Sequence, residues 1–224
     1  MNFLEITAYI GHFILFINLL IYSKGYRYNK SVAFKVFIFY LIITLAIQLI
    51  STYLRSFKIP NLYLSHYYFI GQFILFSLFF KQLLKKKLHK KGITLCLIIV
   101  LTVLGIYYFL YPSNYYKFNV FEIIITSIPL IIYSIFFFVQ KIEDADKKYI
   151  YIVSGFFLYI LCSTLLFTTG NITAEIKKII WEINSLLYVT FQVLIFVEWY
   201  KNFRKKTLVS FQQRDKGVTR NHTF

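Results

Sequence analysis

Acidic side chains are scarce in this chain. It has nine Asp and Glu against 25 Lys and Arg, and 15% of its 224 residues are charged, where a soluble domain has about a quarter. No Asp lies in a long apolar run, which excludes an intramembrane aspartyl protease. The HExxH, GxSxG and Walker-type motifs are also missing. We therefore expect no enzymatic activity, no cofactor and no metal site.

Cysteine is rarer still, with two residues in the chain. Cys96 and Cys162 each lie inside an apolar run, so we interpret them as small apolar packing residues and not as a disulfide. A cleavable leader is not expected, because only Met1 to Phe3 precede the first apolar run and they carry no positive side chain. We expect that run to remain as the first helix.

Apolar residues are abundant instead. The chain is 58% hydrophobic and 21% aromatic, more than one modest soluble core can bury. A helix of about 20 residues crosses the ~30 Å hydrocarbon core of a bilayer, where the backbone must satisfy its own hydrogen bonds. We predict an all-α integral membrane protein with seven transmembrane helices and a basic cytoplasmic tail over residues 201–224. The predicted spans are residues 4–23, 32–54, 61–84, 93–111, 119–140, 150–169 and 178–200.

The basic residues are unevenly distributed between the segments that join these runs. Cationic side chains stay on the cytoplasmic side of short loops. The segments after the first, third and fifth runs, together with the tail, hold 20 of the 25 Lys and Arg. The other side holds Arg55, Lys58, Lys117, Lys177 and Lys178. An even number of spans would spoil this alternation, so we predict an N-terminus outside and a C-terminus in the cytoplasm.

The most basic stretch is KQLLKKKLHKKG, Lys81 to Gly92. We interpret it first as a topology signal. It also fits contact with anionic lipid headgroups, at about 1 kcal/mol per basic residue near the surface, or with RNA or an acidic protein. RNA-binding surfaces normally interleave aromatic residues among the cations, and this stretch has none. The candidate lipid- or partner-binding residues are Lys85, Lys86, Lys87, Lys90, Lys91, Arg204, Lys205 and Lys206.

Polar residues inside the apolar runs are candidates for a ligand site, because they are costly in lipid. In the seventh run, Glu182, Ser185, Tyr188 and Gln192 recur near one helix face. We expect Glu182 and His66 to form the central pair of an outward-facing pocket. The candidate ligand-binding residues, in the outer half of the bilayer or near its middle, are His12, Gln48, His66, Gln72, Glu122 and Glu182.

These polar residues also have a structural interpretation. Interhelical hydrogen bonds, worth about 0.6 kcal/mol on average in membranes, hold helices together. Residues near a helix end can also reach water, as we expect for Glu198 at the inner end. The inner stretches FILFSLFF (73–80) and LIIYSIFFFV (130–139) are almost free of polar groups. A pore or transporter needs a polar lining along much of its length, so this pattern weakens a transport function without excluding it.

The composition resembles that of small multi-pass membrane proteins of AT-rich bacterial genomes, with Lys as the main cation and abundant Ile, Phe, Tyr and Asn. Within that group the chain is similar in size and plan to the membrane accessory proteins encoded beside type VI-B RNA-guided RNases of CRISPR systems. The stretch LSHYYFIGQFILFSLFFKQLLKKK (64–87) carries this resemblance. It implies a bacterial inner-membrane protein without catalysis that modulates a cytosolic RNA-targeting nuclease in antiviral defence through its basic loops.

Three functions from different classes follow from these observations. The first is an accessory or regulatory protein whose basic cytosolic face meets a soluble protein or ribonucleoprotein. The second is a sensor or small-ligand binder that uses the outward-facing pocket and needs a separate output protein. The third is a transporter or channel.

Overall fold

The computed structural model describes residues 3–142, 144–169 and 174–204, and every regular element in that part of the chain is helical. The helices are α1 (Phe3–Gly25), α2 (Val32–Ser56), α3 (Leu64–Leu83), α4 (Lys87–Leu110), η1 (Pro112–Tyr116), α5 (Val120–Ile142), α6 (Ile150–Thr169), α7 (Ala174–Glu198) and η2 (Trp199–Phe203). Six of them are long and apolar enough to cross a membrane; α3 is not among the six. The predicted all-α multi-pass architecture is confirmed at this level, and the seventh span and the orientation remain predictions.

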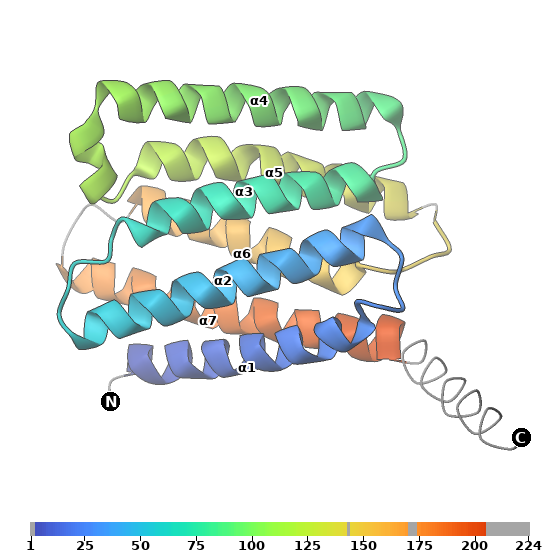
Figure 1. The fold of residues 1–224 in the computed structure, drawn as a ribbon, viewed down its shortest axis with the longest axis horizontal. Helices are drawn as coiled ribbons and strands as arrows, with labels where there is room; N and C mark the ends of the chain where they lie inside the picture. The colour runs from blue at the N-terminus through green and yellow to red at the C-terminus, as the bar shows by residue number, and fades with distance from the viewer. Residues whose placement is uncertain (1–2, 143, 170–173, 205–224) are drawn as a thin grey trace, which may run out of the picture.

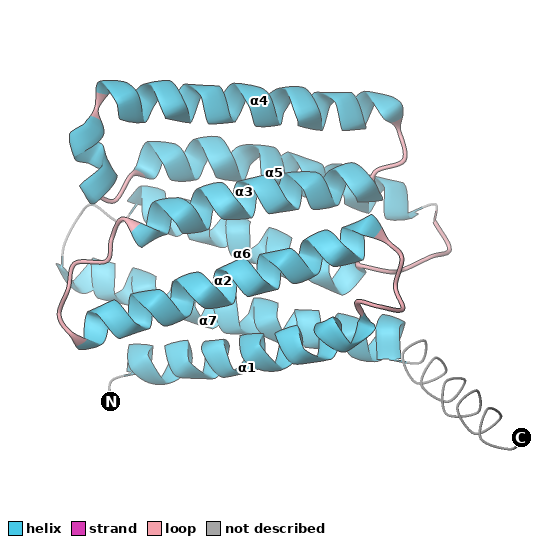
Figure 2. Cartoon of the chain, viewed as in Figure 1, coloured by secondary structure: helices cyan, strands magenta, loops and turns pink. Residues whose placement is uncertain are grey.

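The long helices lie roughly alongside one another in one bundle (Figures 1 and 2). Helices α1, α2, α3, α5, α6 and α7 pack pairwise in that cyclic order, because α7 contacts both α6 and α1. Helix α4 packs mainly against α3 and α5 and lies outside this ring. Consecutive helices run in opposite directions, so α1, α3, α5 and α7 all end on one side (Figure 1). We call this side the lysine-rich end, because it holds Lys24, Lys30, Lys85, Lys86, Lys87 and Lys201. The opposite side is the tyrosine-rich end, which holds Tyr63, Tyr67, Tyr107, Tyr111, Tyr115 and Tyr116.

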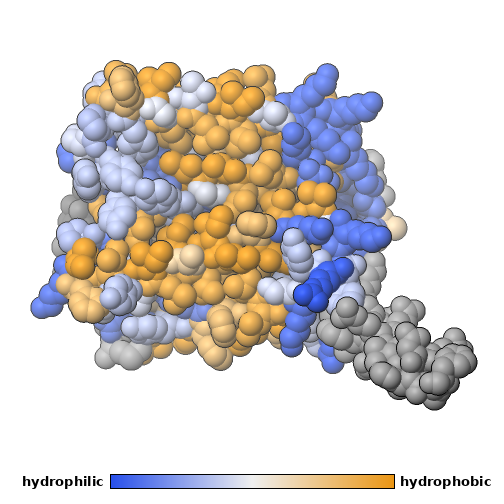
Figure 3. All heavy atoms as spheres, in the orientation of Figure 1, coloured by the Kyte–Doolittle hydropathy of each residue, from blue (hydrophilic) through white to orange (hydrophobic). Residues whose placement is uncertain are grey.

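The surface polarity follows the bundle axis. On the face shown in Figure 3, hydrophobic residues form a band across the middle, and hydrophilic residues lie at both ends. Large apolar side chains such as Phe13, Phe39 and Phe109 are exposed. Exposed apolar surface of this extent is stable in lipid and not in water. The chain is therefore a multi-pass membrane protein.

The lysine stretch departs from its predicted structure. Helix α3 ends at Leu83 and α4 begins at Lys87, so three residues join them where the sequence predicts a longer loop before residue 93. The side-chain amide of Gln140 in α5 fixes this short link: Oε1 accepts from the Lys85 amide at 2.7 Å, and Nε2 donates to the Leu83 carbonyl at 3.1 Å. Lysine is a good helix former, so α4 extends beyond its apolar part.

Aromatic rings fill the bundle on the lysine-rich side of its middle. Phe76 of α3 and Phe156 of α6 are stacked with centroids 3.6 Å apart, and Tyr40 of α2 meets Phe76 edge-on at 4.7 Å. Phe191 of α7 completes the cluster, because its ring packs near those of Phe156 and Tyr40. The predicted apolar inner half is therefore a packed aromatic core.

Glu198 contradicts its predicted position in headgroup water. It is fully buried at the lysine-rich end of α7. Its carboxylate accepts from the backbone amides of Tyr149 and Tyr151 at 2.6 and 2.9 Å, and from Asn202 Nδ2 at 2.7 Å. The first amides of a helix have no partner inside the helix and carry a partial positive charge, so a carboxylate is well placed at the start of α6.

Candidate functional site

A cavity of about 480 Å³ lies in the tyrosine-rich half of the bundle. Its wall comes from the first half of α1, the last turns of α2, the start of α3, the second half of α6 and the first half of α7. The wall includes the buried Tyr159 and Tyr188 and the exposed Arg55 and Leu62, so the cavity runs from the interior to the surface. Its volume falls within the range of about 300–1,000 Å³ that is typical of small-molecule sites.

The polar groups of the wall are joined in pairs across helices. His12 Nε2 of α1 lies 3.1 Å from Gln48 Oε1 of α2, so the structure brings these two predicted residues together in the pocket. The hydroxyls of Tyr68 and Tyr159 are 3.1 Å apart, which links α3 to α6. Gln72 lies outside the wall, and its Nε2 donates to the Tyr68 hydroxyl at 3.2 Å. Gln72 therefore supports a wall residue instead of facing the cavity.

Tyr188 is a wall residue with a buried, unsatisfied polar group. Its side chain is 8% exposed, and its hydroxyl has no hydrogen-bond partner among the described residues. Helix α1 passes close to its ring at Gly11, where a Cβ atom would lie 2.9 Å from the ring carbons. A buried hydroxyl without a partner costs about 1–3 kcal/mol, so a ligand that supplies one gains from it.

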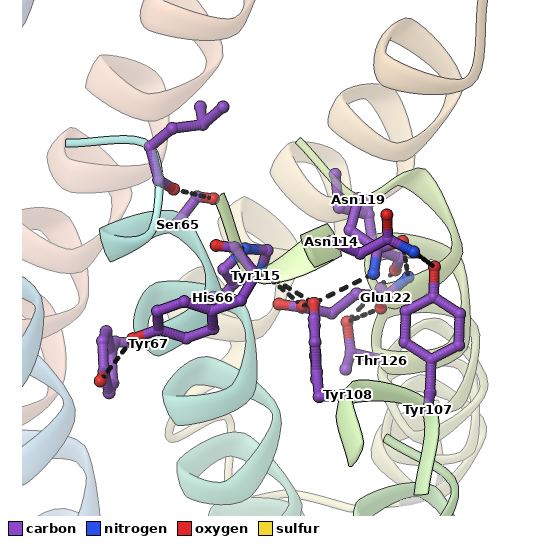
Figure 4. Close-up of polar contacts among 12 residues, drawn as sticks. Ser65, His66, Tyr67, Tyr107, Tyr108, Asn114, Tyr115, Asn119, Glu122 and Thr126 are labelled. Carbon is purple, nitrogen blue, oxygen red and sulfur yellow. Dashed lines mark hydrogen bonds and ion pairs between the residues drawn. The ribbon is translucent and has the colours of Figure 1, made fainter. Parts of the chain in front are cut away.

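A second polar cluster lies outside this pocket, between α3, α4 and α5 (Figure 4). His66 Nδ1 lies 2.7 Å from Glu122 Oε2, and both residues are buried. The Tyr108 hydroxyl donates to the same carboxylate oxygen and accepts from Asn119 Nδ2 at 3.0 Å. His66 Nε2 faces the Tyr115 carbonyl at 2.9 Å. Glu122 Oε1 has no partner in the part of the chain that the structure describes.

The expected pairing of Glu182 with His66 is wrong: His66 is paired with Glu122, and neither His66 nor Glu182 is in the pocket wall. Glu182 is partly exposed and lies 4.0 Å from Lys178. Each residue of a helix advances about 100°, so Glu182 is rotated about 60° from Ser185 and further from Tyr188. Ser185 and Tyr188 face the pocket together with Asn184, which sequence reasoning missed. The ligand-binding roles remain predictions.

The lysine-rich end holds the other candidate residues. Lys85 Nζ lies 2.9 Å from Asp144, and this ammonium, with the Asp146 amide, lowers the pKa of Asp144 to about 2. Lys86, Lys87, Lys90 and Lys91 have no ion-pair partner among the described residues.

The predicted basic tail is described only in its first residues. Arg204 is exposed and lies with its guanidinium 4.9 Å from the centre of the Tyr200 ring. Lys205 and Lys206 lie outside the described residues. The predicted lipid- or partner-binding roles are not tested by this geometry.

No protein-family model, curated protein or solved structure matches the chain.

Proposed function

We propose that this protein is a multi-pass membrane receptor or binding protein for a small molecule, which enters the pocket between α1, α2, α3, α6 and α7 from the tyrosine-rich end. The predicted orientation places that end outside the cell. In this proposal, ligand binding is passed on to a separate output protein.

The buried Tyr188 hydroxyl carries this proposal. The ring of Tyr188 lines a cavity of small-molecule size, and its buried hydroxyl has no partner among the described residues. Other polar groups of the wall are paired across helices, as His12 is with Gln48 and Tyr68 with Tyr159. The aromatic core of Tyr40, Phe76, Phe156 and Phe191 fills the bundle on the other side of its middle. A cavity that is blocked in this way fits a binding site better than a transport path.

Two neighbouring residues of α7 provide the test. In a chain with Cys96 and Cys162 replaced by alanine, Ser185→Cys places a thiol in the pocket wall, and Leu186→Cys places one on the exposed apolar surface. A charged, membrane-impermeant thiol reagent added outside intact cells should modify the Ser185→Cys chain and leave the Leu186→Cys chain unmodified. If the reagent modifies both chains equally, the pocket is not distinguished from the exposed surface and the proposal is refuted. If it modifies neither chain when added from either side of the membrane, the pocket is not accessible.

A second candidate function is an accessory protein for a cytosolic partner, as the resemblance to CRISPR-associated membrane proteins implies. Its support is the set of unpaired lysines Lys86, Lys87, Lys90 and Lys91. Lys86 is the N-cap of α4, and Lys87, Lys90 and Lys91 lie in its first two turns. At Lys86 and Lys87 the helix dipole disfavours a cation by about 0.3–1 kcal/mol each. The helix dipole therefore does not account for them, whereas a negatively charged partner or lipid surface at this end would attract them, in addition to their predicted role in setting the topology.

This second function is tested by affinity purification from the native host with a tag after Phe224. Glutamine at Lys86, Lys87, Lys90 and Lys91 should release a stoichiometric soluble partner. Lys85 stays unchanged, because it forms the ion pair with Asp144. Glutamine at Lys24, Arg27, Lys30 and Lys201, which lie outside the candidate partner-binding residues, is the matched control for net charge. A partner that is retained by the first variant does not bind through this surface.

A further inference from the structure

We propose that the pocket takes an amphiphile with a carboxylate head and a hydroxyl or carbonyl further along its chain. This inference rests on the proposed binding function and adds the chemical class of the ligand. The carboxylate would lie at Arg55, the apolar chain against the aromatic wall, and the second oxygen at Tyr188.

Arg55 makes the pocket selective for anionic ligands. It is the permanently charged side chain of the pocket wall, and the wall contains no Asp or Glu. Among the described residues, no acidic side chain lies within ion-pair distance of Arg55. Its position in the last turn of α2 suits the helix dipole, but this leaves the guanidinium donors available. A guanidinium binds a carboxylate through two parallel hydrogen bonds and attracts anions to the mouth of the pocket.

Aromatic and aliphatic side chains supply the surface for an apolar chain. Phe167 lies between Phe118 and Trp181, with its ring centroid 5.2 Å from each of theirs. Leu4 and Ala8 of α1 form part of the same wall. On α1 the wall extends from Leu4 to His12, about 12 Å along the helix axis at 1.5 Å per residue. The apolar part of a ligand can lie along this length of the wall.

Tyr188 supplies the second polar contact. Its hydroxyl is buried and unpartnered, so a purely apolar chain would leave it unsatisfied. The Tyr188 ring lines the cavity and its hydroxyl oxygen is closed off beneath the surface. A ligand oxygen that enters beside the ring would accept from the hydroxyl or donate to it. Tyr133 of α5 also has a buried, unpartnered hydroxyl and lies outside the pocket wall, which makes it a matched control.

The test measures protection of the introduced thiol in the Ser185→Cys chain, reconstituted in neutral lipid nanodiscs, against a neutral maleimide. Decanoate should protect the thiol and decyltrimethylammonium should not. ω-Hydroxydecanoate should protect at lower concentration than decanoate. Arg55→Gln should weaken carboxylate protection at least about tenfold, because hydrogen bonds to charged groups are the strong ones, whereas Lys58→Gln should not. Tyr188→Phe should remove the advantage of the hydroxyl group, and Tyr133→Phe should keep it.

The outcomes separate the ligand class from the pocket itself. If both charge types protect equally, or if Arg55→Gln has no effect, the carboxylate assignment is wrong and the binding function stands. If Tyr188→Phe keeps the advantage of ω-hydroxydecanoate, the second contact is wrong. If the thiol never reacts in any lipid, both proposals fail together. Nanodiscs with phosphatidylglycerol, whose anionic group is a phosphodiester, provide a further comparison. Slower labelling in these nanodiscs without added decanoate would show that an anionic lipid occupies the pocket and would overturn the carboxylate assignment, and unchanged labelling would support it.

Discussion

The imidazole of His66 and the carboxylate of Glu122 meet at 2.7 Å inside the bundle, away from the pocket. His66 Nε2 faces a backbone carbonyl, which can only accept, so that nitrogen carries a proton. One further proton then lies between Nδ1 and Oε2, and the pair is neutral overall whichever atom bears it. Together with Tyr108 and Asn119, the pair fastens α4 to α3 and α5.

Removing either side chain of this pair should lower the free energy of unfolding. We expect Glu122→Leu and His66→Leu each to lower the free energy of unfolding by about 3–5 kcal/mol, because each leaves a buried polar partner alone. The double variant should be no less stable than the worse single variant. A double-mutant cycle of unfolding in mixed detergent micelles measures this coupling. Costs that simply add would show that the two side chains act independently.

The ion pair of Lys85 with Asp144 predicts a window of acid sensitivity. The pKa of Asp144 is lowered from 3.8 to about 2, so the carboxylate contributes stability at pH above about 4. This contribution is lost as pH falls from about 4 to about 2, where the folded protein must bind the proton. The melting temperature of the native chain should fall towards that of Asp144→Asn across this window. A constant difference between the two chains from pH 6 to pH 2 would contradict the prediction.

Gly155 marks a close contact between α6 and α7. A Cβ atom there would lie 3.0 Å from Leu194 and Phe191, whereas Gly105 in α4 has open space around it. We expect Gly155→Ala to destabilise the fold by about 1–3 kcal/mol through overpacking. Gly105→Ala should be neutral or stabilise by up to about 1 kcal/mol, because alanine is the better helix former. Thermal unfolding of the two variants should rank them in this order, and the reverse order would place the close packing elsewhere.

Glu198 should be needed as an acceptor at the start of α6. Glu198→Ala leaves the buried amide of Tyr149 without its partner, at a cost of about 1–3 kcal/mol for each unsatisfied group. Glu198→Gln keeps one acceptor oxygen and should lie between the native chain and Glu198→Ala in stability. Amide hydrogen exchange at Tyr149 and Tyr151 should increase in the same order. Unchanged exchange in Glu198→Ala would refute the capping role.

The lengths of the apolar segments alone predict most of this fold, because a helix satisfies the backbone hydrogen bonds of a long apolar segment in lipid. The start of α4 at Lys87 was missed because the sequence shows where the apolar run begins, whereas the helix continues through residues that favour helix without being apolar. Glu198 was placed wrongly for a different reason. Its partners are backbone amides of another helix, and no residue type signals them.

The pocket was predictable in part. The cost of polar groups in lipid identified His12 and Gln48, and the helical period identified Ser185 and Tyr188. Tyr68 and Tyr159 were missed because the chain has 20 tyrosines and no single one stands out. The partner of His66 could not be deduced, since it depends on the rotation of α3 and α5 about their own axes.

Fluorescence of Trp181 tests the binding function most directly. Trp181 lies in the pocket wall and the second tryptophan, Trp199, lies at the opposite end, so Trp199→Phe leaves a single reporter. Titration with a brominated decanoate should quench Trp181 with a saturable curve, and Ala8→Leu, which places a larger apolar side chain in the cavity wall, should weaken the saturable part. Quenching that only follows the amount of quencher in the lipid, and that is the same in Ala8→Leu, would contradict binding of a carboxylate amphiphile in this pocket.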